Sequence, residues 1–410
     1  MFTLSRRAFL AGASVVACYP LWANGISSDL QRFVVGTFTN SQDEDIPTDF
    51  GIHRKASDIS EGIYAFTLNT KSGQLSQAEL VANVSNPVNL ITHPTLNVLY
   101  ACRGQGTQIN GQNVITAYRW HHNHFVELNS VMSGGLGPTV GQVSHDGKQL
   151  LTTHFASDSI VAIPLAANGA LLNQQQTMGK PFVTGEYRIR APGEETHRDS
   201  WPEMDIGKPH DIQFSQTQRY AIATEIAANR CRVLKVDKTS GRLLFHSVAN
   251  DAPGAGPRHI AWHPGFQFLY TSGEGTSSVS AWRWNEHDGT LTLLQNESVL
   301  PLGYRGDNHT ADIVMHPSGK WVFVSNRGAG SIASFSINSQ DGRFTLHQHV
   351  ELSSPSCWSM QFDKTGQWAL VTEQIADQVS LWRCDVKSGD LIRTENRVRV
   401  VLPSCIRNWV

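Results

Sequence analysis

Four short segments, far apart in the chain, carry histidine, arginine and acidic side chains in combinations that suit acid–base chemistry. They read Pro209-His210-Asp211, Gly256-Pro257-Arg258-His259, Asn308-His309-Thr310-Ala311-Asp312 and Ser325-Asn326-Arg327-Gly328. Imidazoles transfer protons near neutral pH, and guanidinium groups hold carboxylates or stabilise a developing oxyanion. Glu225, Glu274 and Gln374 stand in three further segments of the same kind. Together these residues could position a general base next to a site for negative charge.

Searches for other chemistry find little. The chain has no CxxC pair, P-loop, GxSxG elbow, HExxH motif or EF-hand loop, so we expect no metal and no cofactor. Residues 328–333 match the pattern GxGxxA, but residues 331–337 alternate as a strand does. A dinucleotide site needs a helix at that point, and we therefore reject this interpretation.

The composition excludes several classes of protein. Of the 410 residues, 40% are hydrophobic and 17% are charged, which is enough apolar material for a large core. Lys and Arg total 33 against 35 Asp and Glu, so the net charge is −2 and no basic surface for nucleic acid or an anionic membrane is expected. The 17 histidines outnumber the six cysteines, which directs attention to imidazole chemistry.

The N-terminus is typical of an export signal. Ser5-Arg6-Arg7-Ala8-Phe9-Leu10 precedes a short apolar run over residues 11–17, and Ala23 offers a small residue for cleavage. The paired arginines resemble a twin-arginine signal, so we expect a leader over residues 1–23, the twin-arginine export machinery as a partner, and a periplasmic or secreted protein. Alternatively, Val15-Val16-Ala17-Cys18 resembles a lipobox, and a lipid on Cys18 would then anchor the mature chain.

Internal repeats account for the rest of the chain. A turn glycine flanked by alternating apolar residues recurs, and Gly289, Gly342 and Gly389 are 53 and 47 residues apart. Each period holds about four strands without a helical pattern, which predicts propeller blades. We therefore expect an all-β fold, a single seven-bladed β-propeller of four-stranded blades over residues 30–410, with an insertion at about 185–207. The early strand 33–38 and the late run 398–402 are predicted to share one blade and join the chain ends.

The direction of the strands predicts on which face of the propeller each histidine lies. If each inner strand runs down from a top face, the starts of inner strands and the ends of second strands share that face. All the acid–base segments above fall in these two classes. The remaining turns share the bottom face, where a structural or solvent-facing role is expected for His93, His121, His122, His124, His263, His287 and His316. The run His121-His122-Asn123-His124 is accordingly not interpreted as a metal site.

With these motifs the chain resembles the seven-bladed lactonase family, which includes cycloisomerase-type 6-phosphogluconolactonases and carboxymuconate-lactonising enzymes. The resemblance covers about residues 32–406 and is carried by residues 35–39, 61–64, 256–259 and 324–328. It implies opening or closure of a lactone ring without a metal. The positions that match the family pattern are His210, Glu225, Arg258, His259, Glu274 and Arg327. Two positions depart from it, because Gly137-Pro138-Thr139-Val140 lacks an expected histidine and Arg103-Gly104 replaces Asn-Glu.

These observations predict an exported lactonase that hydrolyses a sugar-acid or similar carboxylic lactone. We expect His210 or His259 to activate water, with Glu225 orienting the base and Arg258 holding charge. Substrate binding is assigned to Glu274, His309, Asp312, Arg327 and Gln374. Two alternatives stay open: a non-catalytic propeller that binds a ligand or a protein through the same face, and an enzyme that closes a lactone ring.

Overall fold

The computed structural model describes residues 29–39, 59–104, 113–173, 176–179 and 207–409. The leader expected at residues 1–23 and, except for Gly207, the insertion expected at 185–207 lie outside these ranges. The regular elements of the described residues are strands, and none of these residues forms a helix long and apolar enough to cross a membrane.

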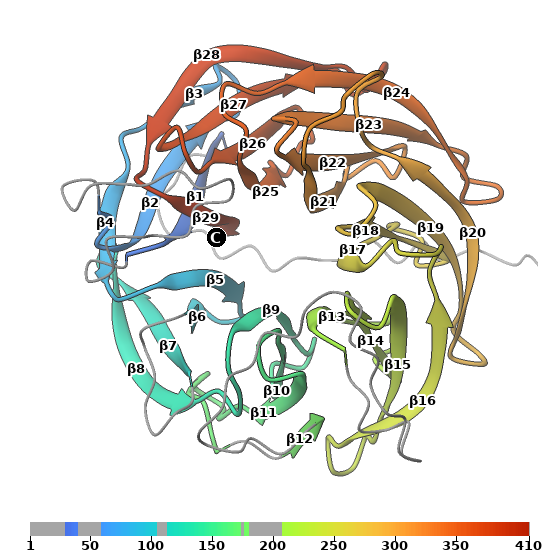
Figure 1. The fold of residues 1–410 in the computed structure, drawn as a ribbon. Helices are drawn as coiled ribbons and strands as arrows, with labels where there is room; N and C mark the ends of the chain where they lie inside the picture. The colour runs from blue at the N-terminus through green and yellow to red at the C-terminus, as the bar shows by residue number, and fades with distance from the viewer. Residues whose placement is uncertain (1–28, 40–58, 105–112, 174–175, 180–206, 410) are drawn as a thin grey trace, which may run out of the picture.

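Seven antiparallel sheets surround a central channel (Figure 1); six have four strands in radial order, and the seventh has the same four-stranded order with the short β3 (Gln74–Leu75) as an extra strand at its outer edge. The innermost strands are β29 (Pro403–Trp409), β5 (Pro87–Thr92), β9 (Pro138–Val143), β13 (Pro209–Phe214), β17 (Pro257–Trp262), β21 (His309–Met315) and β25 (Cys357–Phe362). The second strands are β1 (Leu30–Thr37), β6 (Val98–Arg103), β10 (Gln149–His154), β14 (Tyr220–Glu225), β18 (Phe268–Gly273), β22 (Trp321–Arg327) and β26 (Trp368–Glu373). This is the predicted seven-bladed propeller.

The outer half of each blade is a hairpin. The third strands are β2 (Gly62–Asn69), β7 (Val114–His121), β11 (Ser159–Pro164), β15 (Arg230–Val236), β19 (Ser278–Asn285), β23 (Ser331–Ile337) and β27 (Gln378–Cys384). The outermost are β4 (Glu79–Asn83) beside the short β3 (Gln74–Leu75), then β8 (His124–Met132), β12 (Gln176–Gly179), β16 (Leu243–Asn250), β20 (Thr290–Ser298), β24 (Phe344–Glu351) and β28 (Leu391–Arg399).

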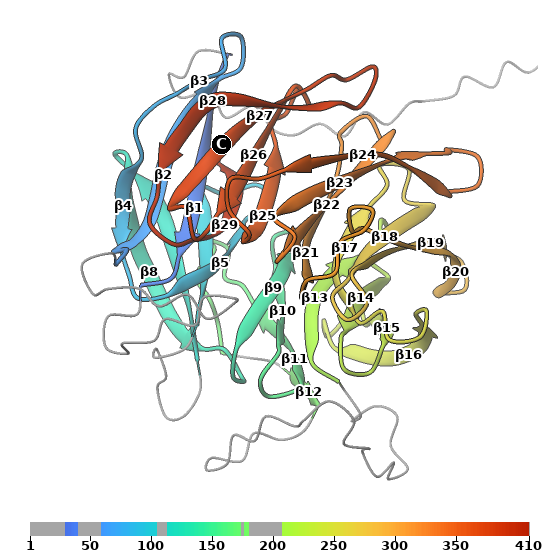
Figure 2. The same ribbon diagram turned by 45° about the horizontal axis from the view of Figure 1, so that its top comes forward.

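The core of the described residues is divided into seven apolar layers, one between each pair of neighbouring blades. Tyr270 and Phe335, from adjacent blades, are both fully or almost fully buried in one such layer. Strands with two apolar faces fit this arrangement because each sheet is covered on both sides. The tilted view in Figure 2 shows the blades stacked face to face in this way.

The ring closes through one blade that contains both chain ends. The C-terminal strand β29 is its innermost strand and pairs with β1, with Val35 opposite Ile406. The shared blade expected from the sequence is confirmed, but the position expected for the late strand, residues 398–402, is wrong. Residues 398 and 399 instead end β28, and the closing strand begins at Pro403.

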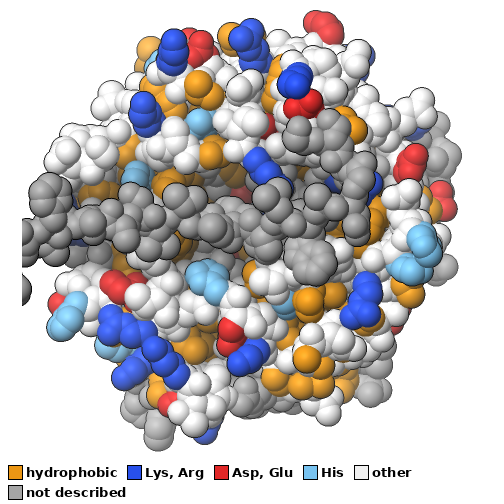
Figure 3. Space-filling view, turned by 180° about the vertical axis from the view of Figure 1, so that it is seen from behind, with side chains coloured by type: hydrophobic (Ala, Val, Ile, Leu, Met, Phe, Trp, Pro, Cys, Tyr) orange, Lys and Arg blue, Asp and Glu red, His pale blue; other side chains and the backbone are white. Residues whose placement is uncertain are grey.

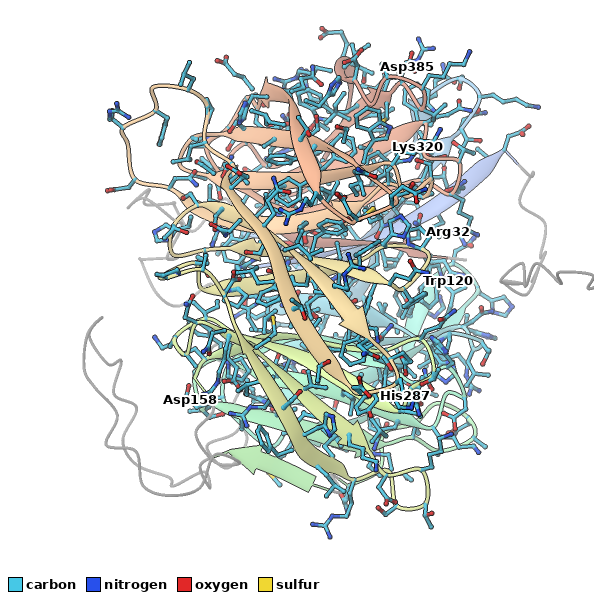
Figure 4. The ribbon with its side chains drawn as sticks, turned by 90° about the vertical axis from the view of Figure 1, so that its right-hand side faces the viewer. Arg32, Trp120, Asp158, His287, Lys320 and Asp385 are labelled. Carbon is cyan, nitrogen blue, oxygen red and sulfur yellow. The ribbon has the colours of Figure 1, made fainter. Side chains whose placement is uncertain are left out.

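The strand directions also follow the prediction. Figure 4 places Asp158, between β10 and β11, at one face, whereas His287 and Lys320 lie in turns at the opposite face. His93 and His316 occupy the first turns of their blades, and each ring bonds to the next blade's turn, His93 Nε2 to Gly147 O at 3.2 Å and His316 Nε2 to Gly366 O at 2.9 Å. These histidines therefore connect neighbouring blades.

Candidate active site

Every blade carries the same irregularity where its innermost strand begins. In β17, Pro257 pairs with Gly273 but Ile260 pairs with Thr271, so two residues stand opposite one. The same one-residue bulge recurs in the other six blades. A bulge redirects side chains that strict alternation would send to opposite faces. As a result, consecutive residues such as Arg258 and His259, or Trp358 and Ser359, line one cavity.

This cavity opens at the top of the channel and has a volume of about 360 Å³. Its walls come mostly from the starts of innermost strands and the ends of second strands, and Arg407 lies further along the innermost strand β29. The charged and imidazole side chains that line it are His210, Arg258, His259, Glu274, Arg327 and Arg407. Its other side chains include Phe38, Asn86, Asn89, Thr139, Phe155, Trp358, Ser359, Ser404 and Cys405.

The structure brings five of the nine predicted site residues to the cavity: His210, Arg258, His259, Glu274 and Arg327. Asp312 and Gln374 lie behind it and hold residues that line it. His309 lies beside Glu274, with Nδ1 3.9 Å from Oε1, and its side chain is 54% exposed. Glu225 alone points away.

Glu274 joins the two arginines of the predicted site. Arg327 Nη2 donates to Oε1 at 2.7 Å, and Arg258 Nε lies 3.4 Å from Oε2. Burial opposes ionisation of this carboxyl, but Arg258 and Arg327 outweigh it and hold the pKa of Glu274 below its usual value. Glu274 is therefore ionised at neutral pH, and it fixes two guanidinium groups side by side.

His259 has the arrangement of an oriented base. Its Nδ1 lies 2.8 Å from Asp312 Oδ1, and Arg258 Nη1 lies 3.1 Å from its Nε2. Burial, followed by the charge of Arg258, lowers the pKa of His259, and Asp312 offsets part of this change. The imidazole is neutral at pH 7, so the Nδ1 hydrogen bond to Asp312 leaves the lone pair on Nε2.

The second imidazole, His210, packs beside the first, with ring centroids 4.9 Å apart. Burial and the nearby charges of Arg258, His259 and Arg327 hold its pKa well below the usual value. Its buried Nδ1 has no hydrogen-bond partner among the described residues. The cavity thus contains two neutral imidazoles in contact.

The structure does not support the predicted role of Glu225. This fully buried carboxylate is bonded by Arg230 at 2.6 Å and by Arg232 within its own blade. Glu225 pairs with Pro209, and the equivalent residue in the next blade is Gly273, which pairs with Pro257. Glu274, which lines the cavity, follows Gly273 directly, so its equivalent in this blade is Ile226 and not Glu225. A shift of one residue along a strand moves a side chain to the opposite face.

Gln374 acts on the cavity through Trp358. Its Oε1 accepts a hydrogen bond from Trp358 Nε1 at 2.9 Å. The indole is packed by Arg327 at 4.8 Å and Arg258 at 5.9 Å, measured to the ring centroid, and by Phe38 at 5.3 Å between centroids. Trp358 forms an aromatic wall that was not predicted from the sequence, although its place at the start of β25 would have indicated it.

Arg407 is the only charged cavity residue, among the described residues, that was not predicted. It belongs to β29, and the wrong position expected for the closing strand excluded it from the candidates. Among the described residues, no group of three or more His, Cys, Asp or Glu side chains could hold a metal ion. His121, His122 and His124 lie at the turn between β7 and β8, on the bottom of the propeller. Figure 3 shows the bottom face, where histidine side chains occur at several separate places.

Residues 32–408 match the family described as "Lactonase, 7-bladed beta-propeller", and the chain therefore belongs to this family. It is 26% identical to 6-phosphogluconolactonase of Bacillus subtilis (strain 168) over 352 residues, which cover 85% of this chain and 94% of that protein. It is 22% identical to 6-phosphogluconolactonase of Yersinia pestis (strain Pestoides F), over 65% of this chain and 74% of that protein.

Solved structures show the same fold. A periplasmic gluconolactonase of Pseudomonas aeruginosa superposes with a TM-score of 0.78 at 23% identity, covering 93% of this chain and 99% of the other. A protein from Lactobacillus plantarum gives a TM-score of 0.76 at 23% identity, covering 92% and 99% of the two chains.

Proposed function

We propose that this protein is an exported lactonase that hydrolyses an unphosphorylated sugar-acid or similar carboxylic lactone. The observation that supports it most directly is the contact between an oriented imidazole and a guanidinium in one cavity. Arg258 Nη1 lies 3.1 Å from His259 Nε2, and Asp312 fixes the other side of the ring. His259, which can act as the general base that deprotonates water, therefore lies beside Arg258, which can stabilise an oxyanion. Ester hydrolysis requires both groups.

In the proposed reaction, His259 exchanges its contact with Arg258 for one with water. Nε2 takes a proton as the water oxygen attacks the lactone carbonyl, and Arg258 and Arg327 stabilise the oxyanion that forms. Collapse of this intermediate breaks the ring C–O bond, and the imidazolium returns its proton to the leaving alkoxide. Asp312 stabilises the imidazolium between these steps. Glu274 keeps the two guanidiniums in place.

The proposed location and substrate rest on separate arguments. The leader expected at residues 1–23 supports export, and sugar phosphates are cytosolic metabolites, so an unphosphorylated lactone fits an exported enzyme better. The imidazoles and guanidiniums that cluster in one cavity favour an enzyme over a non-catalytic binding propeller. Ring closure would use the same groups in reverse.

Hydrolysis of glucono-1,5-lactone above the spontaneous rate tests the proposal. We expect Arg258→Ala to reduce kcat/KM by about 10²- to 10³-fold, as the loss of an oxyanion donor does in other hydrolases. His287→Gln removes an exposed imidazole on the opposite face and should leave the rate unchanged. Wild type and Arg258→Ala both at the spontaneous rate would overturn the proposal for this class of substrate.

A further inference from the structure

The two halves of the cavity differ in their chemistry. Its imidazoles, its carboxylate and two of its guanidiniums come from three neighbouring blades, whose innermost strands are β13, β17 and β21. These strands lie to the right of the channel in Figure 1, whereas β25, β29, β5 and β9 lie to its left. We call the two sides the reaction half and the binding half. The proposed reaction uses only the reaction half, so the binding half contacts the rest of the substrate.

One position at the end of each second strand shows this difference. In the blade of β17, Pro257 pairs with Gly273, and Glu274 is the next residue. The equivalent pairs in the other blades place at this position Phe38, Gly104, Phe155, Ile226, Arg327 and Gln374. Charged side chains therefore occupy it in two adjacent blades of the reaction half. In three adjacent blades of the binding half, two phenylalanines and a glycine occupy it and line the cavity.

The starts of the innermost strands add to this difference. In the binding half their second residues are Ser404, Val88, Thr139 and Trp358. The hydroxyl protons among them are used within the protein. Ser404 Oγ donates to the carbonyl oxygen of Val88 at 2.8 Å, and Thr139 Oγ1 lies 2.7 Å from Thr153 Oγ1, which donates to the carbonyl oxygen of Val140. These residues therefore offer few hydrogen bonds to the hydroxyl groups of a ligand.

Three aromatic rings line the binding half. Phe38, Phe155 and Trp358 are only partly buried, although they line the cavity. The rings of Phe38 and Trp358 meet edge to face with centroids 5.3 Å apart, and Phe155 lies in the same way beside His210 at 6.0 Å. Aromatic surface that stays exposed in a cavity is stabilised when an apolar group of a ligand covers it.

Both departures from the family pattern belong to the binding half. Gly104 occupies the position that Glu274 has in its own blade, and Val140 occupies that of His259. A Cβ on Gly104 would lie 3.2 Å from both Cγ atoms of Val88, so a larger residue here would cover that side chain. Two positions that could carry polar groups therefore leave apolar surface in this chain.

Arg407 is the one charged side chain with which the binding half lines the cavity, among the described residues. It lies further along β29 than Ser404, and Asp211 and Asp312 of the reaction half interact with its charge. The protein itself thus supplies carboxylates to this guanidinium. The aromatic rings remain the surface that a ligand can cover on this side.

We propose that Phe38, Phe155 and Trp358 determine the substrate specificity by covering an apolar part of the lactone. This part is an alkyl or aryl substituent on a ring carbon remote from the carbonyl. The inference rests on the proposed function for the reaction, and it narrows the substrate to carboxylic lactones with few hydroxyl groups. Glucono-1,5-lactone contains the same ester and stays a substrate, but it binds more weakly because its hydroxyl groups meet apolar rings.

Calorimetric binding of open-chain acids tests the specificity without turnover. The probes 5-hydroxynonanoate and 5-hydroxypentanoate are the products of δ-nonalactone and δ-valerolactone, and they differ by one butyl chain. Each buried CH2 group strengthens binding about fourfold, so we expect wild type to bind 5-hydroxynonanoate about 10- to 100-fold more tightly. Gluconate has the same carboxylate and a hydroxylated chain, and it should bind no more tightly than 5-hydroxypentanoate.

Variants show which side chains produce this preference. Phe38→Ala and Phe155→Ala each remove one ring from the binding half, and each should reduce the preference for the butyl chain to less than about a third of the wild-type value. Leu346→Ala truncates a 49% exposed side chain of the outermost strand β24 and should keep the full preference. The melting temperature of each variant shows that it is folded.

Hydrolysis of the two lactones separates this inference from the proposed function. We expect the advantage of δ-nonalactone over δ-valerolactone to lie in a lower KM, with similar kcat values, because the reacting ester is the same. Equal binding of the two hydroxy acids, gluconate binding as tight as that of 5-hydroxynonanoate, or a preference that survives both alanine substitutions would overturn the inference. In each of these cases Arg258-dependent hydrolysis of glucono-1,5-lactone would leave the proposed function intact. Phe38-dependent binding of 5-hydroxynonanoate without hydrolysis of any lactone would instead refute the proposed function.

Discussion

At the scale of single residues, the pair His259 and Asp312 determines which atom can act as the base. A hydrogen bond between Nδ1 and Oδ1 of 2.8 Å sets the tautomer that leaves Nε2 unprotonated. Asp312 is itself held by the backbone N–H of Met360, with Oδ2 at 2.8 Å, and burial does not prevent its ionisation because His259 and Arg407 lower its pKa. The carboxylate is thus a fixed positioning group rather than a ligand for substrate.

Substitution Asp312→Asn tests this assignment. The amide can donate to Nδ1 and favour the wrong tautomer, so we expect kcat to fall by about 10²- to 10⁴-fold with little change in KM. Asp312 also raises the pKa of His259 against the effects of burial and Arg258. Its removal should therefore lower that pKa further and move the acidic limb of the kcat/KM profile to lower pH. An unshifted limb would show that Asp312 has only a structural role.

A second residue-scale prediction concerns Glu225. Because its carboxylate contacts Arg230 and Arg232 in the interior, Glu225→Gln should lower the free energy of unfolding by about 3 kcal/mol. Urea denaturation measures this loss, with exposed Glu297→Gln as the control. The kcat of the folded fraction should be unchanged, and a selective loss of kcat would restore Glu225 to the catalytic machinery.

Residue type and strand position together predicted much of the candidate site. His210, Arg258, His259, Glu274 and Arg327 were all selected because they begin an innermost strand or end a second one. The same rule does not say which of two adjacent residues at the end of a second strand faces the cavity. Glu225 was therefore selected although its side chain points away from the cavity. Register is determined by pairing across the sheet, which depends on residues far away in the sequence.

At the scale of elements, the first turn of three blades contacts the next blade through a histidine, which packs on a glycine: His93 on Gly147, His263 on Gly319 and His316 on Gly366. Gly366 has a φ of +75°, and a Cβ on it would stand 2.6 Å from Nε2 of His316. Gly319 and His263 repeat the contact one blade earlier, where the Cβ would lie 2.9 Å from Nε2. Such a turn requires glycine both for its backbone conformation and for the space that the imidazole occupies.

Comparison of two glycine substitutions separates these effects. Gly303 has a φ of +84°, and a Cβ on it would meet no described atom within 4 Å, so Gly303→Ala should cost only the backbone preference, about 1 kcal/mol. Gly366→Ala adds a collision with His316, and we expect a loss of about 2 to 3 kcal/mol. Equal shifts in the denaturation midpoint for both variants would contradict the proposed contact between blades.

At the scale of the whole molecule, the closing blade shows where prediction from sequence fails. Residues 398–402 are strongly apolar and were chosen as the last strand, but the true strand, β29, contains Ser404, Arg407 and Asn408. Ser404 and Arg407 line the cavity, and polar residues of this kind interrupt the apolar alternation by which a strand is recognised in a sequence. The other blades were predictable because their turns repeat.

The whole molecule should also lose stability in acid because many of its imidazoles are buried. Burial lowers the pKa of six histidines. The largest effect with a stated value is at the fully buried His154, where burial lowers the pKa to about 3. Neither ring nitrogen of His154 has a hydrogen-bond partner among the described residues. The others are His93, His210, His259, His263 and His316. In the unfolded chain these groups protonate near pH 6.5.

Below that pH the unfolded chain therefore binds more protons than the native chain, so the free energy of unfolding decreases as the pH is lowered. Asp211 and Asp251 act in the opposite direction because burial raises their pKa values, but they are two groups against six.

His154 alone should contribute about 1.4 kcal/mol per pH unit between pH 6.5 and its native pKa. Urea denaturation at a series of pH values should show His154→Gln with a slope lower by about one proton. His287→Gln should retain the wild-type slope because that side chain is 92% exposed, and a free energy of unfolding that stays constant from pH 7 to pH 5 would contradict the role of the buried imidazoles.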